Sequence, residues 1–193
     1  MRVVIWDVDD VLNDLMSEWF DGWWRPRHPE CVVSYGDLVR NPPHTVLGVG
    51  EEEYLASLDA FRDAKFDALA PRPDALRWFA EHGNRADHVA LTAVPEAFAH
   101  LSASWVVRHF GRWIRTFAFV PSRRPSDTAV SRIVSKADYL GWLGRGDVFV
   151  DDRQENVDDA RGIGLNGVVV PSPWNQSPHE TFDAAFRDVA AQL

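Results

Sequence analysis

Five short runs of apolar, largely β-branched residues recur along the chain, and most intervals between them are long enough for a helix. The runs are Arg2–Trp6, His88–Leu91, Thr116–Val120, Val148–Val150 and Gly167–Val170. Strands that lack a polar face are typical of a parallel sheet covered on both sides. Strands that alternate with helices predict βαβ units. We therefore expect an α/β fold with a Rossmann-like parallel sheet flanked by helices.

Helical patterns with recognisable ends fill most of these intervals. Pro73 suits the first turn of a helix, and Gly83 and Gly111 each follow the last residue of an amphipathic stretch. Helices are expected over Pro73–His82, Pro95–Phe110, Ser135–Leu143 and Ser177–Leu193.

The first interval is different, because roughly sixty residues separate the first strand from the Pro73 helix, far more than an ordinary βα connection. Helices are expected there over Asp14–Trp24 and Glu51–Ala64, with a proline-marked loop between them. We expect residues 1–13 and 73–193 to form the core and residues 14–72 a small helical cap inserted after strand one. Open α/β sheets bind ligands at the carboxyl ends of their strands, so this cap is placed to act as a lid.

Acidic residues follow the first strand directly. Asp7 and Asp9 stand two positions apart after the buried run, where both carboxylates can enter the ligand crevice. One carboxylate can attack a phosphorus centre while the other moves a proton to or from an oxygen. The pair therefore predicts catalytic residues for phosphate chemistry.

Three further signals occur later in the chain. Two follow predicted strands, and the third stands near the start of the helix that precedes the Val148–Val150 strand. Thr92, followed by Ala93 at the approach to a helix, can hold phosphoryl oxygens with its hydroxyl and nearby backbone N–H groups. Lys136, the only lysine after Lys65, can neutralise charge on the nucleophile and the phosphate. Asp151 and Asp152 would face the acidic first strand, which requires a counterion such as Mg²⁺. Each feature alone is commonplace, whereas their joint order is hard to obtain by accident.

Composition narrows the classes of partner. The 193-residue chain suits one domain, and its net charge of -9 argues against binding to a nucleic-acid duplex. A lone cysteine, Cys31, excludes a disulfide within the chain. No apolar run has the length of a membrane span, and the N-terminal residues do not resemble a signal peptide. We therefore expect a cytoplasmic enzyme that acts on a small phosphorylated metabolite without a membrane partner, with a homodimer left open.

These motifs resemble those of the haloacid dehalogenase-like hydrolase superfamily, from Ile5–Asn13 (IWDVDDVLN) to Val148–Asn156 (VFVDDRQEN). The resemblance implies that Asp7 forms an aspartyl-phosphate and that Asp9 is the general acid/base. It also implies a Mg²⁺ site made by Asp7, the backbone carbonyl of Asp9 and Asp152, with Asp151 close by or in the surrounding layer. Thr92 and Lys136 would hold the phosphoryl group.

Within that superfamily the chain is most similar to the 5'(3')-deoxyribonucleotidase group, through its DxDxVL motif, its helical cap and the entry Leu69–Leu76 (LAPRPDAL). Asp10 stands where the motif usually has glycine, and Leu15 where that group has an aromatic base-stacking residue. The resemblance implies a phosphatase acting on (deoxy)nucleoside monophosphates. The alternatives are a phosphatase of a non-nucleotide metabolite, such as a sugar phosphate or biosynthetic intermediate, and a catalytically silent binding module.

Aromatic residues cluster in the expected cap. One hypothesis is that Trp19, Trp23 and Trp24 form part of the wall of the substrate pocket and that Arg123 or Arg124 contacts the substrate. The competing interpretation, which we favour by about two to one, is that the tryptophans pack a small helical core.

Overall fold

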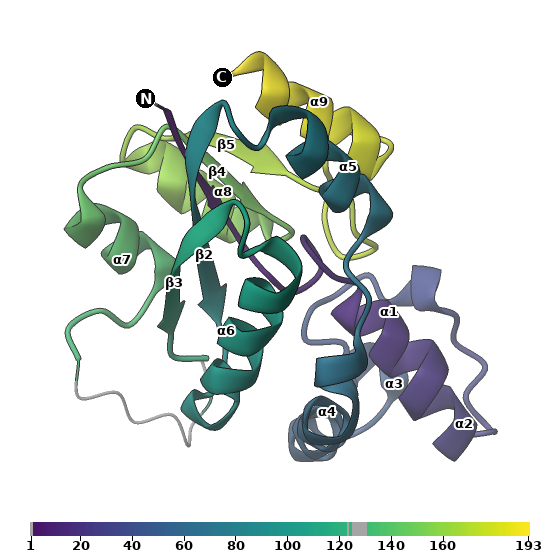
Figure 1. Cartoon of the computed structure of the whole chain (residues 1–193). Coiled ribbons are helices and arrows are strands. Elements are labelled where there is room, and N and C mark those ends of the chain that lie inside the picture. The colour runs from purple at the N-terminus through teal and green to yellow at the C-terminus, as the bar shows by residue number, and fades with distance from the viewer. Residues whose placement is uncertain (1, 123, 125–130) are drawn as a thin grey trace.

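The computed structural model describes residues 2–122, 124 and 131–193. Within them, five strands form one parallel sheet in the order β3-β2-β1-β4-β5, which confirms the predicted fold class (Figure 1). The strands are β1 (Arg2–Trp6), β2 (Ala86–Ala93), β3 (Ile114–Val120), β4 (Val148–Asp151) and β5 (Asn166–Val169). Since β1 lies between β2 and β4, the carboxyl ends of these three strands meet at one edge.

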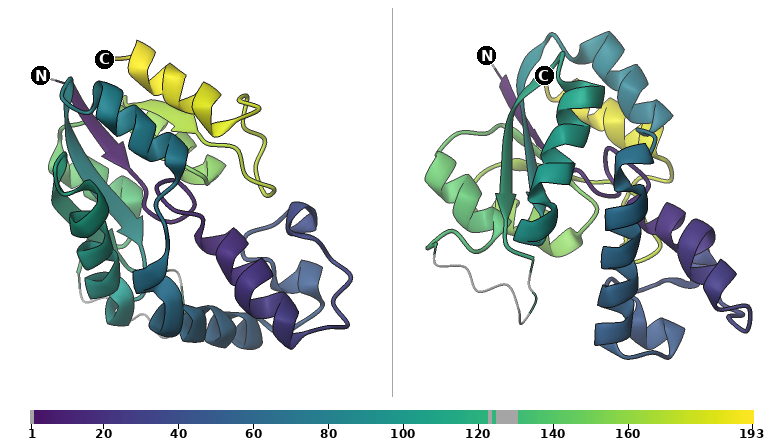
Figure 2. Two further views of the ribbon diagram at one scale, coloured as in Figure 1. Left: turned by 45° about the vertical axis from the view of Figure 1, so that its right-hand side comes forward. Right: turned by 60° about the horizontal axis from the view of Figure 1, so that its bottom comes forward.

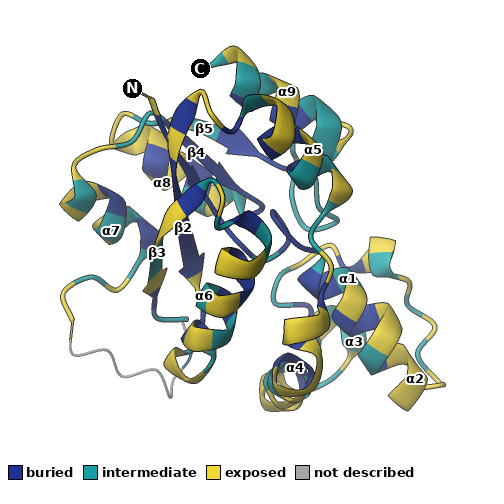
Figure 3. Cartoon of the chain, in the orientation of Figure 1, coloured by how far each residue is buried: buried dark blue, intermediate teal, exposed yellow. Residues whose placement is uncertain are grey.

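Helices cover both faces of the sheet (Figures 1 and 3). Along β1, Val4 and Trp6 belong to one hydrophobic cluster, and Val3 and Ile5 belong to the other. This alternation buries both faces of the strand and explains its unbroken apolar sequence. The first cluster includes residues of α5 (Pro73–His82), α6 (Glu96–Phe110) and α9 (Phe182–Ala191), and the second includes residues of α7 (Lys136–Leu143) and α8 (Gln154–Gly162).

The interval between β1 and α5 is helical, as expected, and lies beyond the carboxyl edge of the sheet (Figure 2). Its elements are α1 (Leu15–Trp19), a π-helical turn (Phe20–Trp24), α2 (Arg25–Arg27), a 3₁₀ turn (Tyr35–Asp37), α3 (His44–Leu47), α4 (Glu51–Lys65) and a second 3₁₀ turn (Phe66–Ala68). We propose that residues 14–72 form a cap domain on a core of residues 1–13 and 73–193.

The two passages between sheet and cap lie side by side. Asn13 and Pro71 form an antiparallel bridge, and the Arg72 N–H donates to the Leu12 carbonyl at 2.8 Å. The Arg72 guanidinium donates to the Asn13 carbonyl at 3.1 Å and also pairs with Asp14. These contacts fix the point at which the cap leaves the core.

One sequence expectation about a helix needs correction, and one helix was not predicted. The final helix begins at Phe182 rather than Ser177, because the Ser177 hydroxyl donates to the Val169 carbonyl in a loop and the Thr181 side chain caps the helix. Helix α8 was missed because it is strongly polar, with only Val157 and Ala160 buried. Among the described residues, no helix is both long enough and apolar enough to cross a membrane.

Candidate active site

Asp7 and Asp9 begin the loop that follows β1. Asp7 is only 6% exposed, and its Oδ1 accepts a hydrogen bond from the Val8 N–H at 2.7 Å. Asp10 then has a positive φ of 60°, which turns the chain sharply. Glycine adopts that conformation most easily, and aspartate tolerates it better than most residues, so the turn survives the substitution of the usual glycine.

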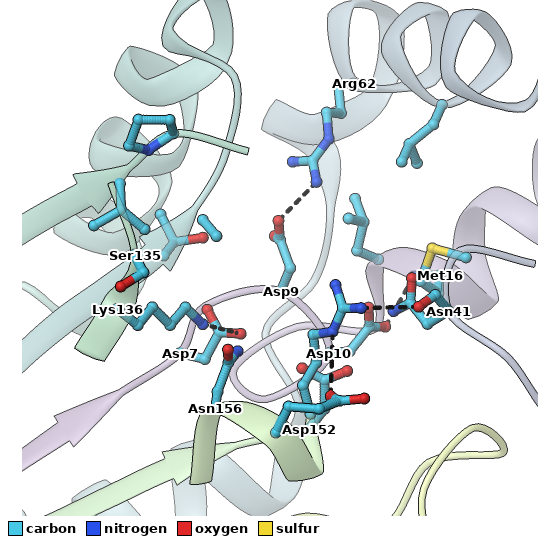
Figure 4. A pocket seen from close by; sticks show the side chains of 18 of the residues that line it. Asp7, Asp9, Asp10, Met16, Asn41, Arg62, Ser135, Lys136, Asp152 and Asn156 are labelled. Atoms are coloured by element: carbon cyan, nitrogen blue, oxygen red, sulfur yellow. Dashed lines mark hydrogen bonds and ion pairs between the residues drawn. The ribbon is translucent and has the colours of Figure 1, made fainter. Parts of the chain in front are cut away.

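Lys136 joins two of the carboxylates. Its buried Nζ lies 2.7 Å from Asp7 Oδ2 and 2.6 Å from Asp151 Oδ2 (Figure 4 shows its contact with Asp7). Burial alone would lower the pKa of Lys136, but the charges of Asp151 and Asp7 outweigh it and raise the pKa above its usual value. Lys136 is therefore held as a fixed cation beside Asp7.

Asp151 and Asp152 follow β4, and their hydrogen bonding differs. Asp151 Oδ1 accepts from the Arg153 N–H and the Asn156 amide, and its Oδ2 accepts from Lys136 and the same amide. Asp152 Oδ2 accepts from the Trp174 indole N–H at 2.7 Å. The structure gives Asp152 Oδ1 no hydrogen bond to any described residue, so Asp152 keeps a free oxygen whereas both oxygens of Asp151 are occupied.

The buried acids carry more negative charge than their cation offsets. Burial raises the pKa of Asp7 well above its ordinary value against the opposing effect of Lys136, and Asp151 and Asp152 raise it further. Burial, followed by the charges of Asp151 and Asp10, likewise raises the pKa of Asp152. Ionising all of these groups together needs additional positive charge.

A divalent metal fits this deficit. Asp7, Asp151 and Asp152 each offer a ligand atom within 4.8 Å of the others, and all three side chains are buried. Carboxylate oxygens are preferred ligands of Mg²⁺ and Ca²⁺. The free oxygen of Asp152 supports a direct ligand there, and the fully bonded Asp151 suits a position in the surrounding layer. The Asp9 carbonyl stays a proposed ligand.

A cavity of about 230 Å³ lies at the carboxyl edge of the sheet, and Asp7 and Asp152 line it, whereas Asp151 is not among its lining residues. Thr92 and Ala93 from the end of β2 lie on its wall with Asp7, Asp9 and Lys136, so the structure brings the proposed catalytic and phosphate-binding residues together. The remaining lining residues are Asp10, Leu15, Met16, Asn41, Tyr54, Leu58, Arg62, Val120, Pro121, Val134, Ser135, Arg153, Glu155 and Asn156.

The cap supplies contacts that the sequence reasoning missed. Arg62 on α4 donates from Nη2 to Asp9 Oδ2 at 2.8 Å (Figure 4). From the core, the Asn13 amide donates to Asp9 Oδ1 at 3.3 Å. On α4, Tyr54, Leu58 and Arg62 recur at a spacing of four and are all buried. An arginine on the apolar face of a helix was the available signal, because buried arginines need an anionic partner.

The aromatic wall hypothesis is not supported, because none of the three tryptophans lines the cavity. Trp19 and Trp24 are 0% and 1% exposed within the hydrophobic cluster, and Trp23 packs partly buried against it. Burying these large rings stabilises the helical insertion, as the core interpretation expected. Arg124 pairs with Asp59 at 2.5 Å and does not line the cavity, and Arg123 lies outside the described residues.

Without metal, the clustered acids are expected to destabilise the protein as the pH rises. Burial raises the pKa of Asp10 to about 8, and the pKa values of Asp7 and Asp152 are also raised. Such acids bind protons more tightly in the folded than in the unfolded state, where the aspartate pKa is about 3.9. Their stabilising contribution is therefore complete below about pH 4 and is lost as the pH rises through the folded pKa, about 8 for Asp10.

Melting temperatures of EDTA-treated protein across this pH range test the effect, with Asp10→Asn as the comparison. The variant should show a weaker loss of stability with rising pH, because it removes one of the three acids and asparagine also tolerates a positive φ. Mg²⁺ should raise the melting temperature more at high than at low pH. An identical pH dependence for wild type and variant would contradict this account.

Solved structures show the same fold. A haloacid dehalogenase-like hydrolase from Streptococcus pneumoniae matches with a TM-score of 0.60 and 10% identity, covering 97% of this chain and 91% of its own. A proposed phosphoglycolate phosphatase from Lactobacillus delbrueckii subsp. bulgaricus gives 0.61 and 15%, with coverage of 100% and 98%. Protein Tyrosine Kinase A from Mycobacterium tuberculosis gives 0.60 and 24%, with coverage of 93% and 87%.

These likenesses establish a haloacid dehalogenase-like fold, in agreement with the resemblance seen in the motifs. None of the three proteins is named as a nucleotidase. No protein-family model and no curated protein matches the sequence.

Proposed function

We propose that this protein is a metal-dependent phosphatase of a small, non-nucleotide phosphate monoester. The observation that carries the proposal is the buried Asp7, held 2.7 Å from Lys136 beside Asp151 and Asp152, with Asp9 in the same cavity. A cation next to a carboxylate lowers the repulsion between that carboxylate and an incoming phosphate. The arrangement therefore suits nucleophilic attack on phosphorus.

In the proposed reaction, an oxygen of Asp7 attacks the phosphorus in line with the leaving oxygen. A new bond forms between Asp7 and phosphorus, the ester P–O bond breaks, and Asp9 gives its proton to the leaving alcohol. Asp9 then takes a proton from the water that attacks the aspartyl-phosphate. Phosphate leaves, and both carboxylates return to their starting states.

Thr92 and Lys136 hold the phosphoryl oxygens in this scheme, while Asp7, Asp152 and the Asp9 carbonyl hold the metal, with Asp151 supporting it. When bound, Mg²⁺ supplies positive charge that offsets the phosphate and the acidic cluster. Asp151 is itself held by the Asn156 amide and accepts from Lys136, so it orients the Lys136 ammonium toward Asp7.

The cavity favours a small substrate over a nucleotide. Its volume of about 230 Å³ lies below the roughly 300–1,000 Å³ of pockets for drug-sized ligands. Tyr54 is the only aromatic residue among its described lining residues, and Leu15 offers no ring for a base to stack on. The non-nucleotide alternative therefore replaces the nucleotidase prediction. The proposed phosphoglycolate phosphatase with this fold is likewise named for a small non-nucleotide phosphate ester.

Phosphate release from a panel of esters tests the proposal. The panel pairs 2-phosphoglycolate, sugar phosphates and p-nitrophenyl phosphate with deoxy- and ribonucleoside monophosphates, each with Mg²⁺ or EDTA. We expect metal-dependent turnover that is greatest for a small non-nucleotide ester. Preference for a nucleotide would overturn the substrate class, and Mg²⁺ binding without turnover of any ester would favour a binding module.

A further inference from the structure

Arg62 is the cavity residue whose bonding is least complete. Its side chain extends from α4 toward Asp9 (Figure 4) and is 7% exposed. Only Nη2 donates a hydrogen bond, to Asp9, whereas Nε and Nη1 are buried and have no hydrogen-bond acceptor among the described residues. Buried donors are nearly always paired, because an unpaired one has lost water without gaining another acceptor.

The other cations of the cavity are already engaged. Lys136 lies between Asp7 and Asp151, and Arg153 donates to the Asn41 carbonyl at 2.9 Å. The groups around Arg62 include the Phe66 ring, 5.6 Å from its guanidinium carbon, and the lining residues Tyr54 and Leu58 on the same helix. None of these offers a second anion, so a molecule that enters the cavity can supply acceptors that the described residues do not.

We propose that Arg62 recognises a second anionic group, a carboxylate or a second phosphate, on the leaving alcohol of the substrate. This inference rests on the proposed phosphatase function and narrows its substrate class. A guanidinium presents its donors in a planar fork that matches carboxylate and phosphate oxygens. Arg62 is therefore a specificity-determining residue contributed by the cap.

The position of Asp9 limits where that anion sits. Asp9 must approach the leaving oxygen to within about 3.2 Å to give it a proton. Arg62 Nη2 is 2.8 Å from the Asp9 carboxylate, so the guanidinium lies near the leaving oxygen. An anionic group within about three bonds of the ester oxygen reaches it. This favours a phosphorylated short hydroxy acid or a compact bisphosphate over an ester with a neutral leaving group.

Substrate pairs that differ in the second charge test the inference. We compare 2-phosphoglycolate and ethylene glycol bisphosphate, each paired with 2-hydroxyethyl phosphate, in wild type, Arg62→Gln and Lys65→Gln. Lys65 is an exposed cation on the same helix and lies outside the cavity, which makes it a matched control. The second anionic group is a carboxylate in the first pair and a phosphate in the second, so the two pairs distinguish which of these groups Arg62 recognises.

Wild type should prefer the member that carries a second anionic group in at least one pair. Arg62→Gln should lower kcat/KM for that substrate by about 100-fold. Arg62→Gln should lower kcat/KM by less than about 10-fold for the ester without a second anionic group and for p-nitrophenyl phosphate. Lys65→Gln should leave kcat/KM unchanged for all of these substrates. Equal losses for both members of each pair would overturn the inference, since Arg62 would then act only through Asp9. Absence of any metal-dependent turnover in wild type would instead overturn the phosphatase proposal.

Binding measured without turnover keeps the test independent of catalysis and of folding defects. In the Asp7→Asn background, calorimetry compares 2-phosphoglycolate with 2-hydroxyethyl phosphate before and after Arg62→Gln. The expected result is tighter binding of the anionic ligand that disappears in the double variant, with circular dichroism unchanged. Equal binding of the two ligands by Asp7→Asn, accompanied by equal binding in the corresponding bisphosphate pair, would contradict the role of Arg62.

Discussion

Replacing Asp7 by asparagine is expected to lower phosphatase turnover by about 10⁴-fold or more, because the amide cannot form the phosphorylated intermediate. The substitution should not lower the melting temperature of the metal-free protein. The raised pKa of Asp7 shows that burying its negative charge is unfavourable, and the carboxamide oxygen can still accept from the Val8 N–H. Loss of activity with retained stability separates a chemical role from a structural one.

Single-turnover and steady-state phosphate release measure this effect, with Asp63→Asn as the control. Asp63 is an exposed acid on α4 that does not line the cavity, so its variant should behave like wild type. Residual activity of Asp7→Asn within 10-fold of wild type, after excluding deamidation by mass spectrometry, would remove Asp7 from the mechanism.

Replacing Lys136 by methionine is expected to destabilise the metal-free protein at neutral pH by about 3–5 kcal/mol, because Asp7 and Asp151 would lose the cation buried between them. Turnover should fall as well, since the same Nζ lies beside the proposed nucleophile. The raised pKa of Lys136 means that its stabilising contribution is complete below the unfolded lysine pKa, about 10.4, and is lost only as the pH rises through the higher folded value.

Urea denaturation in EDTA measures the loss, and Lys65→Met supplies the control for removing an exposed lysine. A second substitution, Asp151→Asn, should recover part of the stability lost in Lys136→Met, because it removes one of the uncompensated charges. An unfolding free energy of Lys136→Met within about 0.5 kcal/mol of wild type would contradict the buried charge network.

The sequence was informative where local pattern and topology agree. The apolar run Arg2–Trp6 could only be a strand buried on both faces, and the carboxyl ends of adjacent parallel strands necessarily meet at one edge. Asp7, Thr92 and Asp152 could therefore be grouped from their positions after predicted strands. In the structure all three residues are buried and line the same cavity.

The contributions of the cap could not be obtained in the same way. The contact between Arg62 and Asp9 joins residues 53 positions apart, and it depends on how the cap packs over the sheet. For Trp19 and Trp24, the sequence does not distinguish a tryptophan that packs in a core from one that lines a cavity. Trp19 on α1 packs against Tyr54 on α4, with 5.3 Å between the ring centroids, and Trp24 in the following turn packs against Trp19 at 5.4 Å between centroids.

The chemical state of Asp7 during turnover is the most direct measurement of the central claim. Protein mixed with Mg²⁺ and its best ester is quenched in acid, treated with borohydride and digested, and the peptide masses are compared with those of an unreacted sample. Borohydride reduces an acyl phosphate to an alcohol, so a phosphorylated aspartate is recovered as homoserine. The account predicts homoserine at Asp7 only when ester and Mg²⁺ are both present, whereas rapid phosphate release without modification of Asp7 would contradict it.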